Sequence, residues 1–176
     1  AGLIALKSFA DGSIIGNSFR EDRTIRTFRE LELSGQGGER SIVFRTSIAR
    51  RFKFPIIEGE RFMTEGVVYD EFTDCHFMII NESLTICEYQ SDGLSSNPKW
   101  LMLRNPGAYM LYYRKRIDMA ISLKERVGYV LRYNFFRQQY KGNAVPNYNG
   151  KHLLFVSMLK PINIIVAQFY KSDSGR

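Results

Sequence analysis

Short apolar runs separated by polar turns fill the first half of the chain. Runs of this length that alternate apolar with polar residues are typical of strands. Asp11 and Gly12, between the first two runs, form a dipeptide typical of a hairpin turn. The pattern predicts strands at 2–8, 13–19, 41–45 and 76–88, and short helices at 24–33 and 64–72, the second with Thr64 as candidate N-cap. An α/β fold is therefore expected here.

The spacing of apolar residues becomes helical after Asn97. Asn105 followed by Pro106 is a good cap and first-turn pair for a helix that reaches about Met119. A second helix is predicted over residues 122–140, and a loop rich in turn residues over 142–150. The second helix is expected to bury one face formed by Leu123, Val127, Val130 and Leu131.

The last apolar run, residues 153–169, is interrupted by Lys160 and Pro161. A membrane-spanning helix needs about 20 consecutive apolar residues, so this run is not expected to cross a bilayer. Packing on a core, or lying on a membrane surface, remain the two interpretations.

Composition limits the class of protein further. The chain has 176 residues, of which 44% are hydrophobic and 14% aromatic, which excludes a disordered chain. Its net charge of +7 makes nucleic acid, anionic membranes and phosphorylated substrates all reasonable partners. Cys75 and Cys87 lack metal-ligand spacing and are expected to be reduced thiols, and no signal peptide is visible. A cytoplasmic protein is expected.

Basic and aromatic residues interleave in both long helices. Residues 109–116 read YMLYYRKR, and residues 129–140 read YVLRYNFFRQQY. This pattern suits nucleic acid or an anionic membrane interface. It equally suits a helix pair whose aromatic rings fill a core while the basic groups face solvent.

Three carboxylates and a glycine lie in the stretch PIIEGERFMTEGVVY, residues 55–69. Glu58, Glu60 and Glu65 are candidates for acid-base chemistry or for orienting hydroxyl groups. The alternatives are that Glu65 is a first-turn acid favoured by a helix dipole, and that the other two are ordinary loop acids. A second polar loop, residues 89–95, reads YQSDGLS and offers either a lid over a substrate or a simple Asp-Gly turn.

These stretches together resemble the inverting family-2 glycosyltransferases of bacteria. The resemblance covers roughly residues 1–120 and is carried by GGERSIVFRT, by FPIIEGERF and by the loop at 89–95. Thr64 and Glu65 occupy the family's acidic pair, with Val68 and Tyr69 in the aliphatic and aromatic positions that follow. The sequence departs from the family at Thr64, where an acid is commoner, and in the loop, where basic residues or His are more usual.

The resemblance implies a GT-A type nucleotide-sugar transferase fold, with a mixed short sheet followed by carboxyl-terminal helices. Glu65 would be the catalytic base. The substrate-binding residues would be Glu58, Glu60, Gln90, Asp92 and Ser95. Residues 1–100 would form the acceptor-side, catalytic half, and residues 101–176 a helical extension.

Family members also have a nucleotide-binding half that ends in an Asp-x-Asp motif. That motif holds a divalent metal, Mg or Mn, under the sugar diphosphate. Neither Asp-x-Asp nor Asp-Asp occurs in this sequence, so the chain is expected to be the carboxyl-terminal half and to be inactive alone.

The expected partners are a nucleotide-sugar donor, a glycan or lipid-linked acceptor and an anionic membrane surface. Nucleic acid is not among them. The implied setting is synthesis of cell-envelope polysaccharide, peripheral to the inner face of the plasma membrane. The alternative is a non-catalytic module that binds membrane or glycan.

Overall fold

The computed structural model describes residues 1–36, 38–90, 93, 97–162, 166–168 and 170. The chain divides into two compact units, which we call the sheet unit and the helical unit. The sheet unit comprises Ala1–Lys53 and Val68–Gly93, and the helical unit comprises Phe54–Val67 and Leu94–Arg176. The expected division lay at residue 100. In the structure, the boundary between the two units lies after Gly93. Residues 54–67 pack with the helices rather than with the sheet.

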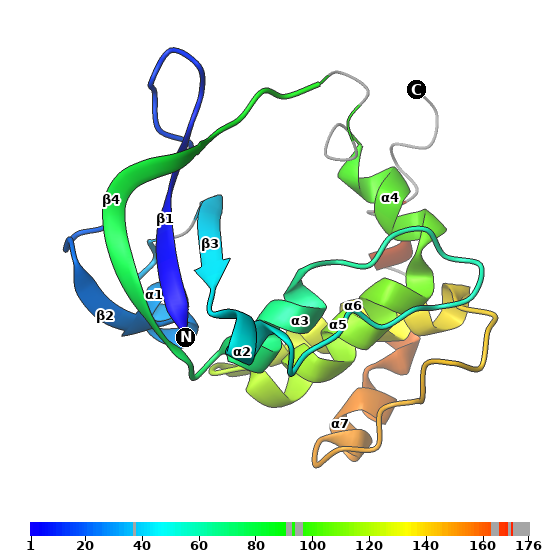
Figure 1. Ribbon diagram of the computed structural model, residues 1–176. Helices are drawn as coiled ribbons and strands as arrows, with labels where there is room; N and C mark the ends of the chain where they lie inside the picture. Colours follow the sequence, from blue (N-terminus) through cyan, green and yellow to red (C-terminus); the bar gives the residue numbers. More distant parts are fainter. Residues whose placement is uncertain (37, 91–92, 94–96, 163–165, 169, 171–176) are drawn as a thin grey trace. The chain divides into compact units, whose positions relative to one another are not determined.

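A mixed four-stranded sheet forms the centre of the sheet unit (Figure 1). Its strand order is β2 (Thr24–Thr27), β4 (His76–Ile86), β1 (Gly2–Ser8) and β3 (Arg40–Phe44). β1 is parallel to β4 and antiparallel to β3, while β2 is antiparallel to β4. The short helices of the unit are α1 (Phe28–Leu33), α2 (Thr46–Ala49), α3 (Gly66–Tyr69), which straddles the unit boundary, and η1 (Asp70–Phe72). The α/β class is confirmed, with three of the four expected strands.

The predicted strand at residues 13–19 is wrong. The turn before it does form, because Asp11 Oδ1 accepts hydrogen bonds from the backbone N–H and the hydroxyl of Ser13. Only a single bridge, between Ser8 and Ile14, follows it. Gly16 then turns the chain with a φ of +88°, which a side chain rarely allows. The hairpin therefore ends after its turn.

The predicted helix at residues 24–33 is half strand. Thr24–Thr27 pairs with β4, and the helix begins only at Phe28. Thr27 accepts a hydrogen bond from the backbone N–H of Glu30, whose carboxylate accepts one from the N–H of Thr27. This capping box fixes the helix start at Phe28. Pairing with the neighbouring strand decides the conformation of the residues before it.

One face of the sheet supports an apolar core. Ile4, Phe77 and Ile79 project from the two central strands and are at most 2% exposed. Phe72 and Leu31 from the short helices pack against them. Successive residues of a strand point to opposite faces of a sheet, and β1 also buries Ala5 between Ile4 and Leu6.

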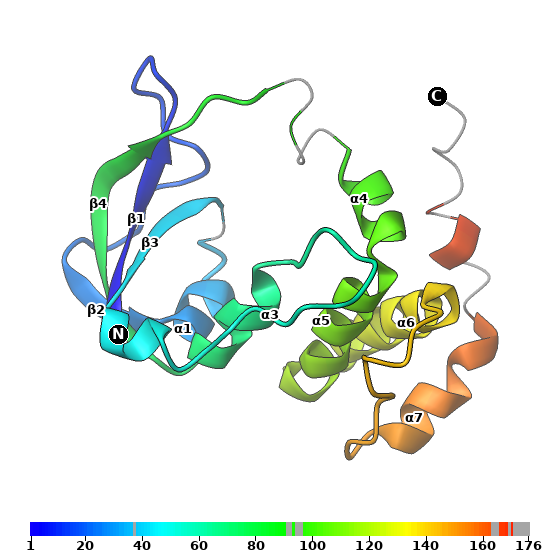
Figure 2. The same ribbon diagram turned by 45° about the vertical axis from the view of Figure 1, so that its right-hand side comes forward.

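The helical unit contains α4 (Pro98–Arg104), α5 (Pro106–Met119), α6 (Leu123–Gln139), α7 (Leu153–Met158) and η3 (Lys160–Ile162). α5 and α6 lie side by side in both views (Figure 1, Figure 2). Both helices are confirmed, with bounds within a residue or two of those predicted. Among the described helices, none combines the length and the apolar character needed to cross a bilayer.

The predicted buried face of α6 is largely wrong. Leu123 is 65% exposed, and of the four predicted residues only Val130 is fully buried. The fully buried residues are instead Tyr133, Asn134, Phe135 and Phe136, which make a complete helical turn, together with Val130. The three rings bury a large apolar area, so α6 is enclosed on all sides at this turn rather than along one face.

The aromatic residues of the two long helices fill the core of the unit. Tyr113 and Phe136 stack with ring centroids 5.9 Å apart, and Phe135 stacks on Tyr170 at 4.8 Å. Arg126 donates to the carbonyls of Ile117 and Ala120 at the end of α5. Of the two interpretations of this basic and aromatic pattern, the structure supports the helix pair with an aromatic core.

Candidate active site

The segment that carries the three glutamates runs irregularly from Phe54 to α3. A tight turn at Glu58 and Gly59 is closed by a hydrogen bond from the N–H of Glu60 to the carbonyl of Ile57, at 3.1 Å. Gly59 has a φ of +82°, which favours glycine there. Ile57 is 5% exposed and packs in the core of the helical unit. The turn is thereby fixed to that unit.

Glu60 caps α5. Its Oε1 accepts from the N–H of Gly107 at 2.5 Å and its Oε2 from the N–H of Ala108 at 2.9 Å. The first N–H groups of a helix lack partners within the helix, and a carboxylate there also meets the positive end of the dipole. Burial raises the pKa of Glu60, while the two N–H donors oppose that rise. Both carboxylate oxygens are therefore engaged within the protein.

Asn105 holds the two residues that follow Glu60 against the start of α5. Asn105 precedes α5, but its side chain does not cap that helix. Its Oδ1 instead accepts from the N–H groups of Arg61 and Phe62, at 3.0 and 3.1 Å. Its Nδ2 donates to the carbonyl of Leu101 at 2.8 Å. This buried amide joins the irregular segment to the junction between α4 and α5.

Glu65 lies directly before α3 and is exposed. It makes no hydrogen bond or ion pair with the described part of the chain. The backbone on either side of it is held, because the N–H of Val67 donates to the carbonyl of Thr64 and Lys115 Nζ donates to the carbonyl of Val67 at 3.0 Å. Gly66 fits against Tyr112, where an added Cβ would lie 2.6 Å from the ring. A free carboxylate thus projects from an anchored backbone.

The other predicted site residues are placed as follows. Glu58 is exposed at its turn, and its carboxylate makes no hydrogen bond or ion pair with the described residues. Gln90 is exposed in the sheet unit, and its carbonyl accepts from the N–H of Gly93 at 3.1 Å. Asp92 and Ser95 lie outside the described residues. Glu58, Glu60 and Glu65 thus lie on one segment of the helical unit, while Gln90 belongs to the sheet unit.

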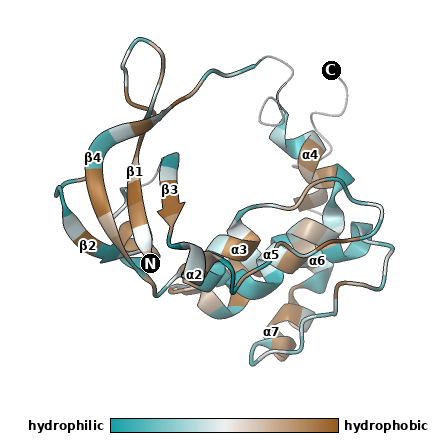
Figure 3. Ribbon diagram, in the orientation of Figure 1, coloured by the Kyte–Doolittle hydropathy of each residue, from teal (hydrophilic) through white to brown (hydrophobic). Residues whose placement is uncertain are grey.

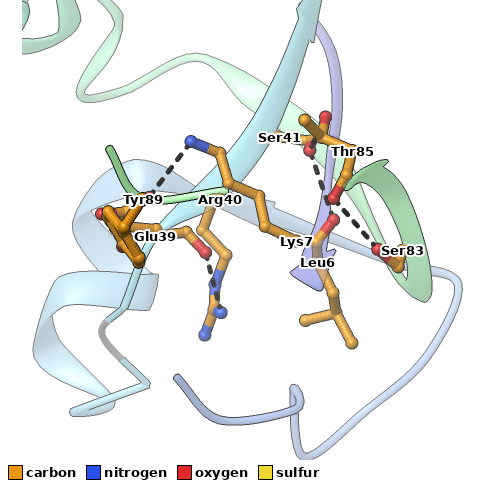
Figure 4. A network of polar contacts seen from close by, with 8 residues as sticks. All are labelled: Leu6, Lys7, Glu39, Arg40, Ser41, Ser83, Thr85 and Tyr89. Atoms are coloured by element: carbon orange, nitrogen blue, oxygen red, sulfur yellow. Dashed lines mark hydrogen bonds and ion pairs between the residues drawn. The ribbon is translucent and has the colours of Figure 1, made fainter. Parts of the chain in front are cut away.

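Sequence reasoning missed a polar network beside the second loop (Figure 4). Tyr89 donates its hydroxyl proton to Glu39 Oε1 at 2.7 Å, and Lys7 Nζ lies 3.4 Å from Glu39 Oε2. The hydrogen bond from Tyr89 lowers the pKa of Glu39 and raises the pKa of Tyr89. The ring of Tyr89 also contacts Phe9, with centroids 5.8 Å apart. No pattern in the sequence links Glu39 to Tyr89, which lies fifty residues later.

This network holds the start of the loop that begins at Tyr89. An open pocket adjoins this network. It is lined by residues that follow β1 and by residues at the end of β4 and just after it, among them Phe9, Asp11, Ile86 and Glu88. Its walls combine apolar side chains with two carboxylates, a lining that can take a ligand carrying hydroxyl groups.

A metal site is not formed by the part of the chain that is described. No group of three or more His, Cys, Asp or Glu side chains there could hold an ion. None of those residues is therefore assigned to the divalent metal that the resemblance implies.

Comparisons with known proteins give no match: no family model, no curated protein and no solved structure resembles the chain.

Proposed function

We propose that this chain is the acceptor-side half of an inverting glycosyltransferase. The reaction moves a sugar from a nucleotide-sugar donor to a glycan or lipid-linked acceptor, on a GT-A type fold. The observation that supports it best is the exposed carboxylate of Glu65, presented by a backbone that is tied to the helical unit on both sides.

The chemistry needs one general base. An acceptor hydroxyl attacks the anomeric carbon while the nucleoside diphosphate leaves from the opposite face of the sugar. The hydroxyl proton must be removed as the new bond forms, and a carboxylate at hydrogen-bond distance can accept it. Glu65 is assigned this role because it has no partner among the described residues, whereas both oxygens of Glu60 are engaged.

The remaining candidates take supporting roles. Glu60 holds the segment on α5 and is a positioning residue rather than a contact to substrate. Glu58 is free to accept hydrogen bonds from sugar hydroxyls. Gln90, Asp92 and Ser95 would contact the sugar diphosphate from the loop that Tyr89 anchors. A divalent metal would neutralise the leaving diphosphate when bound.

The test is Glu65→Gln in the protein expressed from its complete reading frame. A general base contributes about 10²–10⁴-fold to rate, so kcat should fall by about that factor while donor affinity is kept. Glu58→Gln is the matched control, since Glu58 is also an exposed carboxylate on the same segment. It should change the KM for the acceptor more than kcat. Unchanged turnover in Glu65→Gln would show that Glu65 is not the general base.

The competing proposal is a binding module without catalysis. It predicts that neither glutamate variant alters any turnover, because there is none to alter. Hydrolysis or transfer of a nucleotide sugar by the wild-type protein would exclude it.

A further inference from the structure

The helix α7 exposes its apolar side chains. Leu154 is 82% exposed and Met158 75%, while Leu153 and Ile162 beside them are 47% and 42% exposed. Leu154 and Met158 are four positions apart and therefore lie on the same side of the helix. Figure 3 shows the hydrophobic character of α7. We call these four residues the α7 face.

The opposite side of α7 is fixed to α6. Val156 is 2% exposed, and its carbonyl accepts a hydrogen bond from Asn134 Nδ2 at 2.9 Å. The start of the helix is also held, because the N–H of His152 donates to the hydroxyl of Tyr148 at 3.1 Å. Tyr148 in turn donates to Asp118 Oδ1 at 2.7 Å. The α7 face thus points outward because the other side of the helix is anchored.

Charge is distributed unequally between the two units. The helical unit has 15 Lys and Arg against 6 Asp and Glu, a formal charge of +9. The sheet unit has 10 against 12, a charge of −2, and together they give the +7 of the chain. Lys151 and Lys160 flank α7, are exposed, and make no ion pair with the described residues. The exposed apolar side chains therefore lie between free cations on a strongly basic unit.

We propose that the α7 face docks on an anionic phospholipid bilayer. Leu154 and Met158 enter the boundary between headgroups and acyl chains, and Lys151 and Lys160 lie beside lipid phosphates. An apolar strip with flanking lysines is the composition of a segment that lies in a membrane interface. The proposal does not depend on the glycosyltransferase assignment.

Other occupants fit this surface less well. Nucleic acid is bound by cations together with exposed aromatic rings that stack on bases, but the α7 face is aliphatic, and the exposed rings of Phe54 and Trp100 are not part of it. A second copy of the chain would bring two basic units together. A stable protein interface also buries about 800 Å² on each partner, more than four side chains supply. An anionic bilayer complements both the charge and the small apolar area.

The test is co-sedimentation of the full chain with vesicles. Phosphatidylcholine vesicles are compared with vesicles that also contain phosphatidylglycerol. We expect binding to the anionic vesicles only, weakened by salt. The double variant Leu154→Ser, Met158→Ser should bind at least about tenfold more weakly, because it removes two apolar side chains that the membrane would bury. Lys151→Gln with Lys160→Gln should also weaken binding.

Ile86→Ser is the matched control. Ile86 is 72% exposed, comparable with Leu154, but it lies in the negatively charged sheet unit, so its loss should leave binding unchanged. The proposal is overturned if the double serine variant binds like the wild type, if Ile86→Ser weakens binding equally, or if neutral and anionic vesicles bind alike. Binding of a single-stranded oligonucleotide without any binding of vesicles would also overturn it, in favour of nucleic acid.

Discussion

Removal of the Asn105 side chain should destabilise the helical unit more than an ordinary cap deletion would. Asn105 is 4% exposed and makes three hydrogen bonds. In Asn105→Ala, the N–H groups of Arg61 and Phe62 lose their acceptor. An unsatisfied buried donor costs about 1–3 kcal/mol. Because Arg61 is exposed and water can reach part of this backbone, we expect a total loss of about 3 kcal/mol.

Asn97→Ala provides the control. Asn97 is also an asparagine at a helix start, but it is exposed and makes the conventional cap, accepting from the N–H of Trp100 at 3.0 Å. Loss of such a cap costs about 1 kcal/mol. The two variants therefore remove the same type of side chain. The expected difference of about 2 kcal/mol in the free energy of unfolding measures the hydrogen bonds from Asn105 to the irregular segment.

Urea unfolding followed by tryptophan fluorescence is the assay. Trp100 is the only tryptophan of the chain and lies in α4, so its signal reports the helical unit even if the two units unfold separately. Hydrogen exchange at the amides of Arg61 and Phe62 should accelerate in Asn105→Ala and not in Asn97→Ala. If the two variants lose equal stability and these amides exchange at the wild-type rate, the hydrogen bonds from Asn105 do not stabilise the irregular segment.

Two further predictions concern a carboxylate of the sheet unit and one glycine from each unit. Tyr89→Phe should return the pKa of Glu39 toward its ordinary value. A carboxylate whose pKa is lowered in the folded state stabilises the fold above its unfolded value near 4.5, and this stabilisation is lost as pH falls. Urea unfolding followed by circular dichroism, which includes the sheet unit, should therefore show a smaller acid destabilisation in the variant. An identical pH profile would contradict this. Gly2→Ala should cost about 3 kcal/mol, because its Cβ would lie 1.8 Å from the carbonyl oxygen of Val43. Gly128→Ala, which meets only the flexible end of a side chain, should instead gain about 1 kcal/mol, and equal thermal stability of the two variants would refute the steric argument.

Local signals in the sequence predicted much of the fold correctly. The runs that became β1, β3 and β4 are short, apolar and bounded by polar residues, and Pro106 marks the first turn of α5. Thr27 and Glu30 also carried a capping signal that places the helix start correctly. Predicting a helix from Thr24 failed because strand pairing outweighed a weak local preference there.

The candidate site was only partly accessible from the sequence. The cluster of Glu58, Glu60 and Glu65 is contiguous, so sequence alone could identify it as a source of carboxylates. Their separate functions were not accessible. Glu60 differs from Glu65 because Gly107 and Ala108 bring helix N–H groups to it from 47 and 48 residues away.

The sequence by itself determined the α/β class, the two long helices and the basic charge, because periodicity, capping residues and composition are local properties. Only the tertiary structure decided that residues 54–67 belong to the helical unit, and that Glu60 is engaged while Glu65 has no partner among the described residues. It also decided that α7 turns Leu154 outward. The physical reason is that buried backbone groups and apolar side chains must find partners, and those partners come from distant parts of the chain.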